Sequence, residues 1–369
     1  MDYEVRCSAC DYSSQRLVDF RCPSCGQPLE VRQFRKFEAE RIRKGNYTVW
    51  RYASYFPYVK RADVVTLGEG WTPLVRLSTN LSLKLESLNP TGSFKDRGST
   101  VLVSALSPLV RKINGEISED SSGNAGASVA AYAARAGLKA KIYVPETVSG
   151  QKYNQIRFYG AEVVRVKGSR ARVAEEAQKP EAHVFYVGHI LHPLFRDGIR
   201  SLAYEIAEQH DWHSPGRVYV PVSAGTLLLG VIRGFKHLVE SGFLDDMPGI
   251  IACQTRQVSP LYHLFKGLSY QPPERLNSVA DALVSVSPPL LGIMNEELRA
   301  VKGDAVMVEE NEILQAFREL PKLGFFVEPS SAVAYAAYQK QLKTRDISNR
   351  DNSTIILTGA GLKTSLNPD

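Results

Sequence analysis

The 369-residue chain is 44% hydrophobic, 23% charged and 9% aromatic, which is typical of a folded protein of roughly two domains. No apolar stretch approaches the roughly 20 residues that cross a bilayer, and residues 1–4 lack the basic and apolar regions of a signal peptide, so we expect a cytoplasmic protein. The formal charge of +6 does not by itself predict nucleic-acid binding, because Lys and Arg are mostly interleaved with Asp and Glu.

Four of the five cysteines form two Cys-x2-Cys pairs near the start of the chain. Such paired thiolates can surround one tetrahedral Zn²⁺ and leave no open position for a catalytic water, so we predict a structural zinc site in a ribbon-like knuckle over residues 1–31. The alternative is two disulfides, which a reducing cytoplasm disfavours. The predicted ligands are Cys7, Cys10, Cys22 and Cys25.

Residues 32–63 show neither clear strand alternation nor a helical stripe, and we interpret them as a connector that packs on the body of the protein. From residue 64 to residue 369, short β-branched runs alternate with longer amphipathic stretches, which predicts an α/β fold with a parallel sheet covered by helices. Strands are expected at 82–85, 116–119, 139–144, 162–166, 184–187, 217–222, 250–253 and 354–357. Helices are expected at 124–136, 198–209, 227–238, 311–320 and 331–342.

The segment NPTGSFKDRG at 89–98 is a turn followed by a helix start. Desolvation and the positive end of a helix both disfavour an ammonium ion, so Lys95 in this place is suited to attack an aldehyde. The alternative is that Lys95 is a solvated surface group, which is the usual role of a lysine near a helix start.

The segment DSSGNAGAS at 120–128 joins an expected strand to an alanine-rich helix. Free backbone N–H groups at that helix start can face a carboxylate, and Ser121 and Ser122 add hydroxyl donors. The Asn124 amide can donate to a phenolate oxygen. The same pattern is also typical of a helix cap followed by a face of small residues for close packing.

The segment VPVSAGTLLLG at 220–230 runs from a strand end through small residues into an apolar helix. Backbone N–H groups there can approach phosphate oxygens, and two hydroxyls can add donors. Neither a dinucleotide fingerprint nor a Walker loop is present, and a structural turn remains an alternative. The predicted phosphate ligands are Ser223, Ala224, Gly225 and Thr226.

A buried strand is expected to end at Thr358, just before the glycine turn of the segment TGAGLK at 358–363. Ligands of open α/β sheets lie beyond the carboxyl ends of strands, so the Thr358 hydroxyl can face a ring nitrogen of a cofactor. Capping the turn is an equally common role for a lone threonine.

Taken together, these motifs resemble those of the fold type II pyridoxal-phosphate enzymes, and GSFKDRG at 92–98 is similar to the threonine synthase family in particular. LGEGWTPL at 67–74 is similar to that family's leading motif, and residues 7–31 to the zinc knuckle of its archaeal-style members. The resemblance covers most of the chain. It implies two open, twisted α/β domains with the cofactor in the cleft, the smaller and mobile one at about 98–190 and the larger one formed by the remainder.

The resemblance implies roles for individual residues. Lys95 would carry pyridoxal 5'-phosphate as a Schiff base with Phe94 near the ring, and Asn124 would bind the phenolate oxygen. Residues 223–226 would bind the cofactor phosphate, and Thr358 would face the pyridine nitrogen. Ser121 and Ser122 are the candidate ligands of the substrate carboxylate.

The implied reaction is that of a carbon-oxygen lyase acting on phosphates, which converts O-phospho-L-homoserine and water to L-threonine and phosphate. A homodimer with a small-molecule amino-acid substrate is expected, without membrane or nucleic-acid partners. The chain departs from the family pattern at Phe195, where an arginine for the substrate phosphate is usual. Arg196 and Arg200, four residues apart on a helix expected to begin near Asp197, are the alternative cations.

Other functions remain open from the sequence. One is a synthase that acts on O-phosphoserine with a sulfur nucleophile and forms cysteine or cysteate. A second is a serine/threonine ammonia-lyase, although such enzymes typically lack the zinc knuckle. A third is a regulator whose zinc ribbon binds nucleic acid, since basic residues follow the cysteines, although Glu38 and Glu40 interrupt that basic run.

Overall fold

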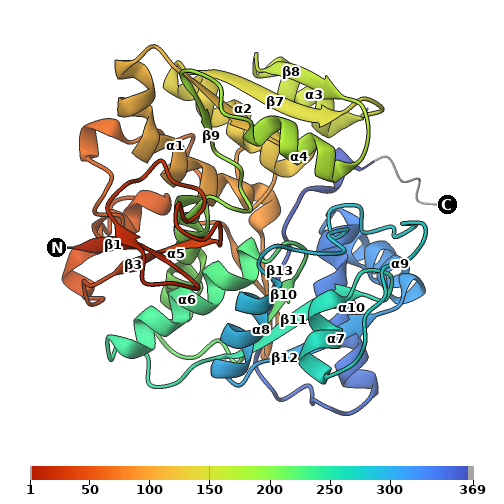
Figure 1. The fold of residues 1–369 in the computed structure, drawn as a ribbon. Coiled ribbons are helices and arrows are strands. Elements are labelled where there is room, and N and C mark those ends of the chain that lie inside the picture. Colours follow the sequence, from red (N-terminus) through yellow and green to blue (C-terminus); the bar gives the residue numbers. More distant parts are fainter. Residues whose placement is uncertain (1, 149, 365–369) are drawn as a thin grey trace. The chain divides into compact units, whose positions relative to one another are not determined.

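The computed structural model describes residues 2–148 and 150–364, which form two compact units (Figure 1). The first unit contains the chain up to Trp71 together with Asn89–Ile199. The second contains Thr72–Leu88 together with the chain from Arg200 onward. Both units combine a mainly parallel sheet with helices, which confirms the predicted α/β fold class. Among the described residues, none of the helices combines the length and apolarity needed to cross a membrane.

A four-stranded parallel sheet with the order β8-β7-β6-β9 forms the main sheet of the first unit. Strand and helix alternate along the chain, because parallel neighbours require a crossover connection. The strands are β6 (Glu116–Glu119), β7 (Lys139–Pro145), β8 (Glu162–Val166) and β9 (Val184–Tyr186). The helices are α1 (Lys95–Lys112), α2 (Asn124–Ala136), α3 (Gln151–Phe158) and α4 (Arg170–Gln178), and the first unit also contains the start of α5 (Pro193–Gln209).

A small antiparallel sheet with the order β2-β1-β3 opens the chain. Its strands are β1 (Tyr3–Cys7), β2 (Ser13–Ser14) and β3 (Leu29–Gln33). The following segment contains 3₁₀ helices at Ala39–Arg41, Val49–Tyr55 and Arg61–Asp63. The Trp50 indole of this segment donates to the Thr100 hydroxyl of α1 at 3.0 Å, so buried aromatic groups fix the connector even though it lacks a regular pattern.

The second unit has a six-stranded sheet with the order β12-β11-β10-β13-β5-β4, in which only the β4–β5 pair is antiparallel. Its strands are β4 (Leu74–Ser78), β5 (Leu81–Lys84), β10 (Arg217–Pro221), β11 (Gly249–Thr255), β12 (Asp304–Val308) and β13 (Ser353–Ile356). Its helices are the rest of α5, α6 (Thr226–Glu240), α7 (Pro260–Lys266), α8 (Leu291–Ala300), α9 (Glu310–Glu319) and α10 (Pro329–Lys343), with 3₁₀ turns at Glu86–Leu88, Leu320–Leu323 and Gly361–Lys363. The central strands β10, β11 and β13 are buried along almost their whole length, as in sheets that helices cover on both faces.

The predicted elements are largely confirmed, and α2, β6 and β8 have the predicted bounds. The start of α5 was predicted too late: it begins at Pro193, because a proline is well accommodated in the first turn of a helix. Helices α3, α4, α7 and α8 were missed, and so were strands β1, β2, β3, β4 and β12. Helices α3 and α4 are mostly polar with few buried residues, so their sequences lack a strong apolar period.

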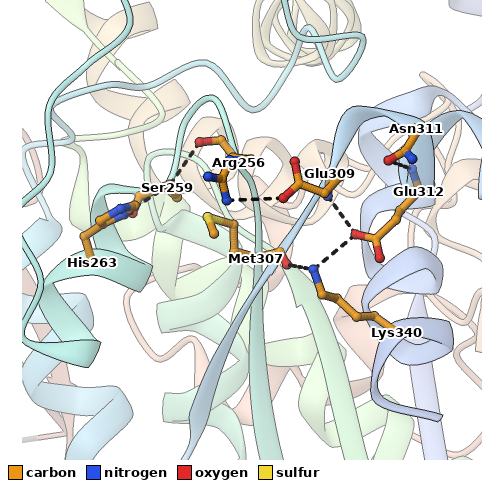
Figure 2. Close-up of polar contacts among 8 residues, drawn as sticks. All are labelled: Arg256, Ser259, His263, Met307, Glu309, Asn311, Glu312 and Lys340. Carbon is orange, nitrogen blue, oxygen red and sulfur yellow. Dashed lines mark hydrogen bonds and ion pairs between the residues drawn. The ribbon is translucent and has the colours of Figure 1, made fainter. Parts of the chain in front are cut away.

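The junction between β12 and α9 shows how polar side chains order the sheet edge of the second unit (Figure 2). Glu309 and Glu312 form a capping box at the start of α9, which satisfies backbone N–H groups that the helix leaves free. Lys340 of α10 donates to the Met307 carbonyl at 2.9 Å and to Glu312 at 3.2 Å. These contacts join one strand to two helices, so the carboxyl end of β12 is well fixed.

A buried ion pair joins β5 to α5 inside the second unit. The side chains of Lys84 and Glu205 are fully buried and in contact with each other. Nζ of Lys84 also donates to the Thr72 carbonyl at 2.6 Å and to Gln209 Oε1 at 2.7 Å. The three donors of the ammonium group are therefore satisfied, which a buried charge requires.

A second buried cation joins α5 to the N-terminal sheet inside the first unit. The Arg196 side chain is fully buried, and its guanidinium bonds the carbonyl oxygens of Ile190 and Leu29 and the Glu30 carboxylate. Leu29 and Glu30 begin β3, directly after the cysteine segment. Arg196 therefore connects the start of α5 to the sheet that carries the cysteines.

We expect Lys84→Met to lower the free energy of unfolding by about 3–5 kcal/mol, because Glu205 then stays buried without the Lys84 cation. Urea denaturation followed by circular dichroism measures the loss. The control is Lys266→Met, which removes a half-exposed pair with Asp304 and should cost less than about 1 kcal/mol. Equal small losses in both variants would show that the Lys84 network contributes little.

We expect Arg196→Met to destabilise the protein by about 3 kcal/mol, because it leaves the mostly buried Glu30 carboxylate and two carbonyl oxygens without the guanidinium donors. Arg172→Met is the matched control, since Arg172 is half-exposed and pairs with Glu175 and Glu176 on the surface. The same denaturation experiment compares the two. An unchanged midpoint for Arg196→Met would mean that the link between α5 and β3 is dispensable.

Candidate active site

Lys95 is the first residue of α1, and the turn before it is fixed by the next residue, Asp96. The buried Asp96 carboxylate accepts hydrogen bonds from the Thr91 backbone N–H at 2.7 Å and from the Thr91 hydroxyl at 2.6 Å. It also accepts one from Ser128 of α2 at 2.6 Å. Asp96 thus holds the turn, α1 and α2 together, and the half-buried Lys95 side chain starts from a rigid backbone.

Two aromatic rings lie beside the Lys95 amine. Nζ of Lys95 is 4.9 Å from the ring centroid of Phe94 and 5.7 Å from that of Phe195. Phe195 can pack so closely because residue 98 is glycine: a Cβ there would lie 2.5 Å from the Phe195 ring. Phe195, at the position where the family usually has arginine, is therefore a packing partner of the α1 start. The Ser93 hydroxyl is buried, and no group among the described residues bonds it.

The turn before α2 belongs to the same unit. Gly123 precedes the helix, whose first backbone N–H groups have no side-chain cap. The Ser121 hydroxyl accepts from the Gly123 N–H at 3.2 Å, and Ser121 and Ser122 are half-buried. Gly126 is required here, since a Cβ would lie 1.8 Å from the Ser121 carbonyl oxygen. Asn124 is buried as the first residue of α2. Free backbone N–H groups at a helix start are donors of the kind that bind anions.

The predicted phosphate-binding segment lies in the second unit at the start of α6. Gly225 has a φ of 97°, and a Cβ at this position would lie 2.4 Å from Met294 Sδ, so glycine is needed on both counts. The first backbone bond of the helix runs from the Leu229 N–H to the Gly225 carbonyl. No side chain caps the helix start, so the N–H groups before Leu229 are donors for an anion. Thr226 is buried, and Ser223 and Ala224 are half-buried.

Thr358 follows β13 in the second unit, at the carboxyl end of the sheet. Its hydroxyl lies 2.9 Å from that of Ser331 on α10, and the Ser331 hydroxyl also accepts from the Gly359 N–H at 2.8 Å. Sequence reasoning missed Ser331, because a serine at the predicted start of a helix is typical of a cap and carries no signal of a distant partner. Together the two hydroxyls form a fixed, uncharged polar pair.

The two arginines proposed for the substrate phosphate are both buried, with exposed fractions of 1% for Arg196 and 5% for Arg200, so neither is a solvated surface group. Arg196 lies inside α5 rather than before it, and its guanidinium binds β3 and the Ile190 carbonyl. This engagement is a structural role that the sequence did not predict. Arg200 lies one turn later on the same helix and belongs to the second unit.

A cluster of ionisable groups at the carboxyl end of β6 was also missed. Glu119 ends the strand, Asp120 follows it, and His189 follows β9. Glu119 is fully buried and contacts His189, while Asp120 bonds Tyr186 at 2.6 Å and Arg170 at 2.7 Å. The same strand end continues into the Ser121–Asn124 turn. A pair of acidic residues before a serine-rich turn gave no sign of burial in the sequence.

The four N-terminal cysteines meet in space. Their sulfur atoms all lie within 4.8 Å of one another, with 3.4 Å between Cys7 and Cys25 and 3.6 Å between Cys10 and Cys22. These distances exceed a disulfide bond, so the disulfide alternative is not what the structure shows. Sulfurs bound at about 2.3 Å to one tetrahedral Zn²⁺ would lie about 3.8 Å apart, so the donor set fits this ion. The fifth cysteine, Cys253, is buried in the core of the second unit.

Solved structures share this fold. The processed form of threonine deaminase isoform 2 from Solanum lycopersicum superposes with a TM-score of 0.68 at 22% identity, covering 88% of this chain and 91% of that one. Maize serine racemase superposes with a TM-score of 0.65 at 23% identity, covering 90% and 95% of the two chains. At these identities the similarity establishes the fold alone.

Sequence relatives are more specific. Threonine synthase of Methanocaldococcus jannaschii is 33% identical over 97% of this chain and 92% of its own length, and that of Methanosarcina acetivorans is 29% identical over 98% and 92%. Residues 65–359 match the family described as "Pyridoxal-phosphate dependent enzyme". The chain therefore belongs to the pyridoxal-phosphate-dependent enzyme family, among the relatives of the threonine synthases.

Proposed function

We propose that this protein converts O-phospho-L-homoserine and water to L-threonine and phosphate, with Lys95 as the residue that carries pyridoxal 5'-phosphate. The observation that carries the proposal is the position of Lys95 at the first residue of α1, after a turn locked by Asp96. The full-length similarity to threonine synthases supports the choice of substrate over phosphoserine, serine or threonine.

The residues present fit the cofactor. The uncapped start of α6 offers backbone donors at the positive end of a helix, and Ser223 and Thr226 add hydroxyls, so this segment would hold the phosphate together with Ala224 and Gly225. The uncharged Thr358 hydroxyl suits an unprotonated ring nitrogen, and Asn124 would donate to the phenolate oxygen. When bound, pyridoxal phosphate supplies an electron sink that stabilises carbanions next to the amino group.

The chain's own side chains would divide the remaining work. Nζ of Lys95 would move protons at Cα and Cβ of the substrate, because it lies where the cofactor is attached. Ser121, Ser122 and the backbone N–H groups of the α2 start would bind the substrate carboxylate. Arg200 is the cation we propose for the substrate phosphate, because the Arg196 guanidinium is engaged with β3.

We further propose that Cys7, Cys10, Cys22 and Cys25 bind one structural Zn²⁺. The buried core of the N-terminal sheet consists of Val5, Leu29, Cys7 and Cys22, with Tyr3, Cys10, Tyr12 and Leu17 partly buried against it. A metal bound by the cysteines would strengthen so small a core. We also propose that the protein is a cytoplasmic homodimer, as the family resemblance implies, with a ribbon-like domain at 1–31 and a connector at 32–63.

We expect borohydride reduction of the cofactor-loaded protein to fix the cofactor to Lys95, identified by peptide mapping. Lys95→Ala should lower kcat for phosphate release from O-phospho-L-homoserine by several orders of magnitude, because both cofactor attachment and proton transfer are lost. Lys112→Ala, an exposed lysine at the other end of α1, is the control and should behave as wild type. Label on another lysine would refute the assignment.

We expect elemental analysis to find one Zn²⁺ per chain in protein purified under reducing conditions. Cys10→Ser should reduce the bound zinc and lower the thermal midpoint while leaving the absorbance of the lysine-bound cofactor in place, because the metal contributes to folding rather than to the chemistry. Cys253→Ser, the fifth cysteine, should keep the full metal content. Wild-type protein that carries no zinc and four reactive thiols would contradict the proposal.

A further inference from the structure

Glu119 and His189 form a doubly bonded pair in the first unit, beside the start of α1. The backbone N–H of His189 donates to Glu119 Oε2 at 2.9 Å, and Nδ1 of the imidazole lies 2.7 Å from Oε1. The Glu119 side chain is fully buried, and that of His189 is 9% exposed. One carboxyl group therefore fixes both the backbone and the ring of His189, and only Nε2 of the imidazole points away from it.

The neighbouring charges decide which carboxyl group is ionised. Asp120 bonds the Arg170 guanidinium at 2.7 Å and accepts from the Tyr186 hydroxyl at 2.6 Å. Glu119 bonds only His189 among the described residues, so the available cation stabilises Asp120. Two adjacent buried carboxylates would repel each other, and the one without a cation keeps its proton more readily.

The pKa directions agree with this geometry. Burial, followed by repulsion from Asp120, raises the pKa of Glu119 well above its usual range, against weaker opposing effects of the His189 N–H, Arg170 and Lys95. Burial also acts to raise the pKa of Asp120, but Arg170 and Tyr186 outweigh it and the pKa is lowered. Burial, and then the Lys95 charge, lower the pKa of His189 well below its usual range.

The proton of Glu119 determines the tautomer of His189. A protonated carboxyl group donates to Nδ1, so the proton of the neutral imidazole must sit on Nε2. An ionised carboxylate would instead accept from Nδ1–H, and Nε2 of the neutral ring would carry a lone pair. With Glu119 protonated, the pair is uncharged and presents the Nε2–H of His189 as a donor. With Glu119 ionised, the pair is anionic and presents Nε2 as an acceptor.

We propose that Glu119 stays protonated at neutral pH and holds His189 as the neutral Nε2–H tautomer, so that Glu119 adds no second negative charge beside Lys95 to that of the Arg170-paired Asp120. Both side chains lie next to the Phe195 ring: the His189 ring contacts it edge-on with centroids 5.8 Å apart, and Nζ of Lys95 is 5.7 Å from its centroid. Resting on the proposed role of Lys95, this makes Glu119 and His189 positioning residues. An ionised Glu119, which has no Arg170 to offset its charge, would favour the ammonium form of Lys95, and an ammonium group cannot attack a carbonyl group.

The experiment uses the full-length protein without cofactor or substrate, so its outcome does not depend on the proposed reaction. Nitrogen chemical shifts of the His189 ring report the tautomer, and the infrared band of a protonated carboxyl group reports Glu119. Glu119→Gln is the diagnostic variant, because its amide reproduces both contacts of a protonated carboxyl group: the oxygen accepts and the nitrogen donates. Glu181→Gln, on an exposed partner of Lys141, is the control.

We expect wild type at neutral pH to show Nε2–H and a protonated-carboxyl band that only Glu119→Gln removes. In Glu119→Gln, His189 should remain the Nε2–H tautomer, and this tautomer should no longer change with pH. Asp120→Asn should move the loss of the band to lower pH, because it removes the repulsion that raises the pKa of Glu119. The rate of Lys95 acylation, followed by mass spectrometry, should be equal in wild type and Glu119→Gln below the pH at which the band disappears. Above that pH, the rate should be higher in Glu119→Gln than in wild type.

Either of two results would overturn the proposal: an Nδ1–H tautomer in wild type at neutral pH, or a Glu119→Gln variant that leaves the protonated-carboxyl band unchanged. If Lys95 is acylated at the same rate in wild type and in Glu119→Gln at every pH, Glu119 has no positioning role. Failure to form threonine in a separate assay would refute the proposed function without affecting these readouts.

Discussion

The candidate site depends on the Asp96 carboxylate at the start of α1. This buried group accepts two hydrogen bonds from Thr91 and one from Ser128, so it fixes the turn, its own helix and α2 in one arrangement. Charge-assisted bonds of this kind each contribute about 1.5–3 kcal/mol, which is enough to order a short loop. These hydrogen bonds fix the backbone position of Lys95. The absence of a Cβ at Gly98 lets the Phe195 ring pack against the start of α1.

Several buried charged side chains among the described residues have a defined ionic partner. Lys84 meets Glu205 in the second unit, Arg196 meets Glu30 in the first, and Asp120 meets Arg170 beside the Ser121–Asn124 turn. A buried ion pair adds little stability compared with an apolar pair, but it is costly to break. These pairs therefore act mainly as constraints that fix where strands and helices meet, and Glu119 differs from them in having an imidazole instead of a cation.

The sequence predicts the elements whose pattern is strong and local. Helix α2 is bounded by Gly123 and Gly137, and β8 by polar turns, so their limits follow from neighbouring residues. The segments around Lys95, Ser223 and Thr358 could be placed at helix starts and strand ends for the same reason. Contacts between distant segments could not be predicted: Arg196 reaches β3 across 167 residues, and Glu119 reaches His189 across 70. No local pattern encodes such a partner, and burial decides whether a charged residue is structural or solvated.

The proposed reaction removes the phosphate ester from Cγ of O-phospho-L-homoserine and adds a hydroxyl group at Cβ. Incubation with O-phospho-L-homoserine in ¹⁸O-labelled water tests it most directly. We predict that the label appears in the hydroxyl group of threonine and that the released phosphate carries none, because phosphate leaves with its ester oxygen. Homoserine with labelled phosphate, or a keto acid with ammonia, would contradict the account.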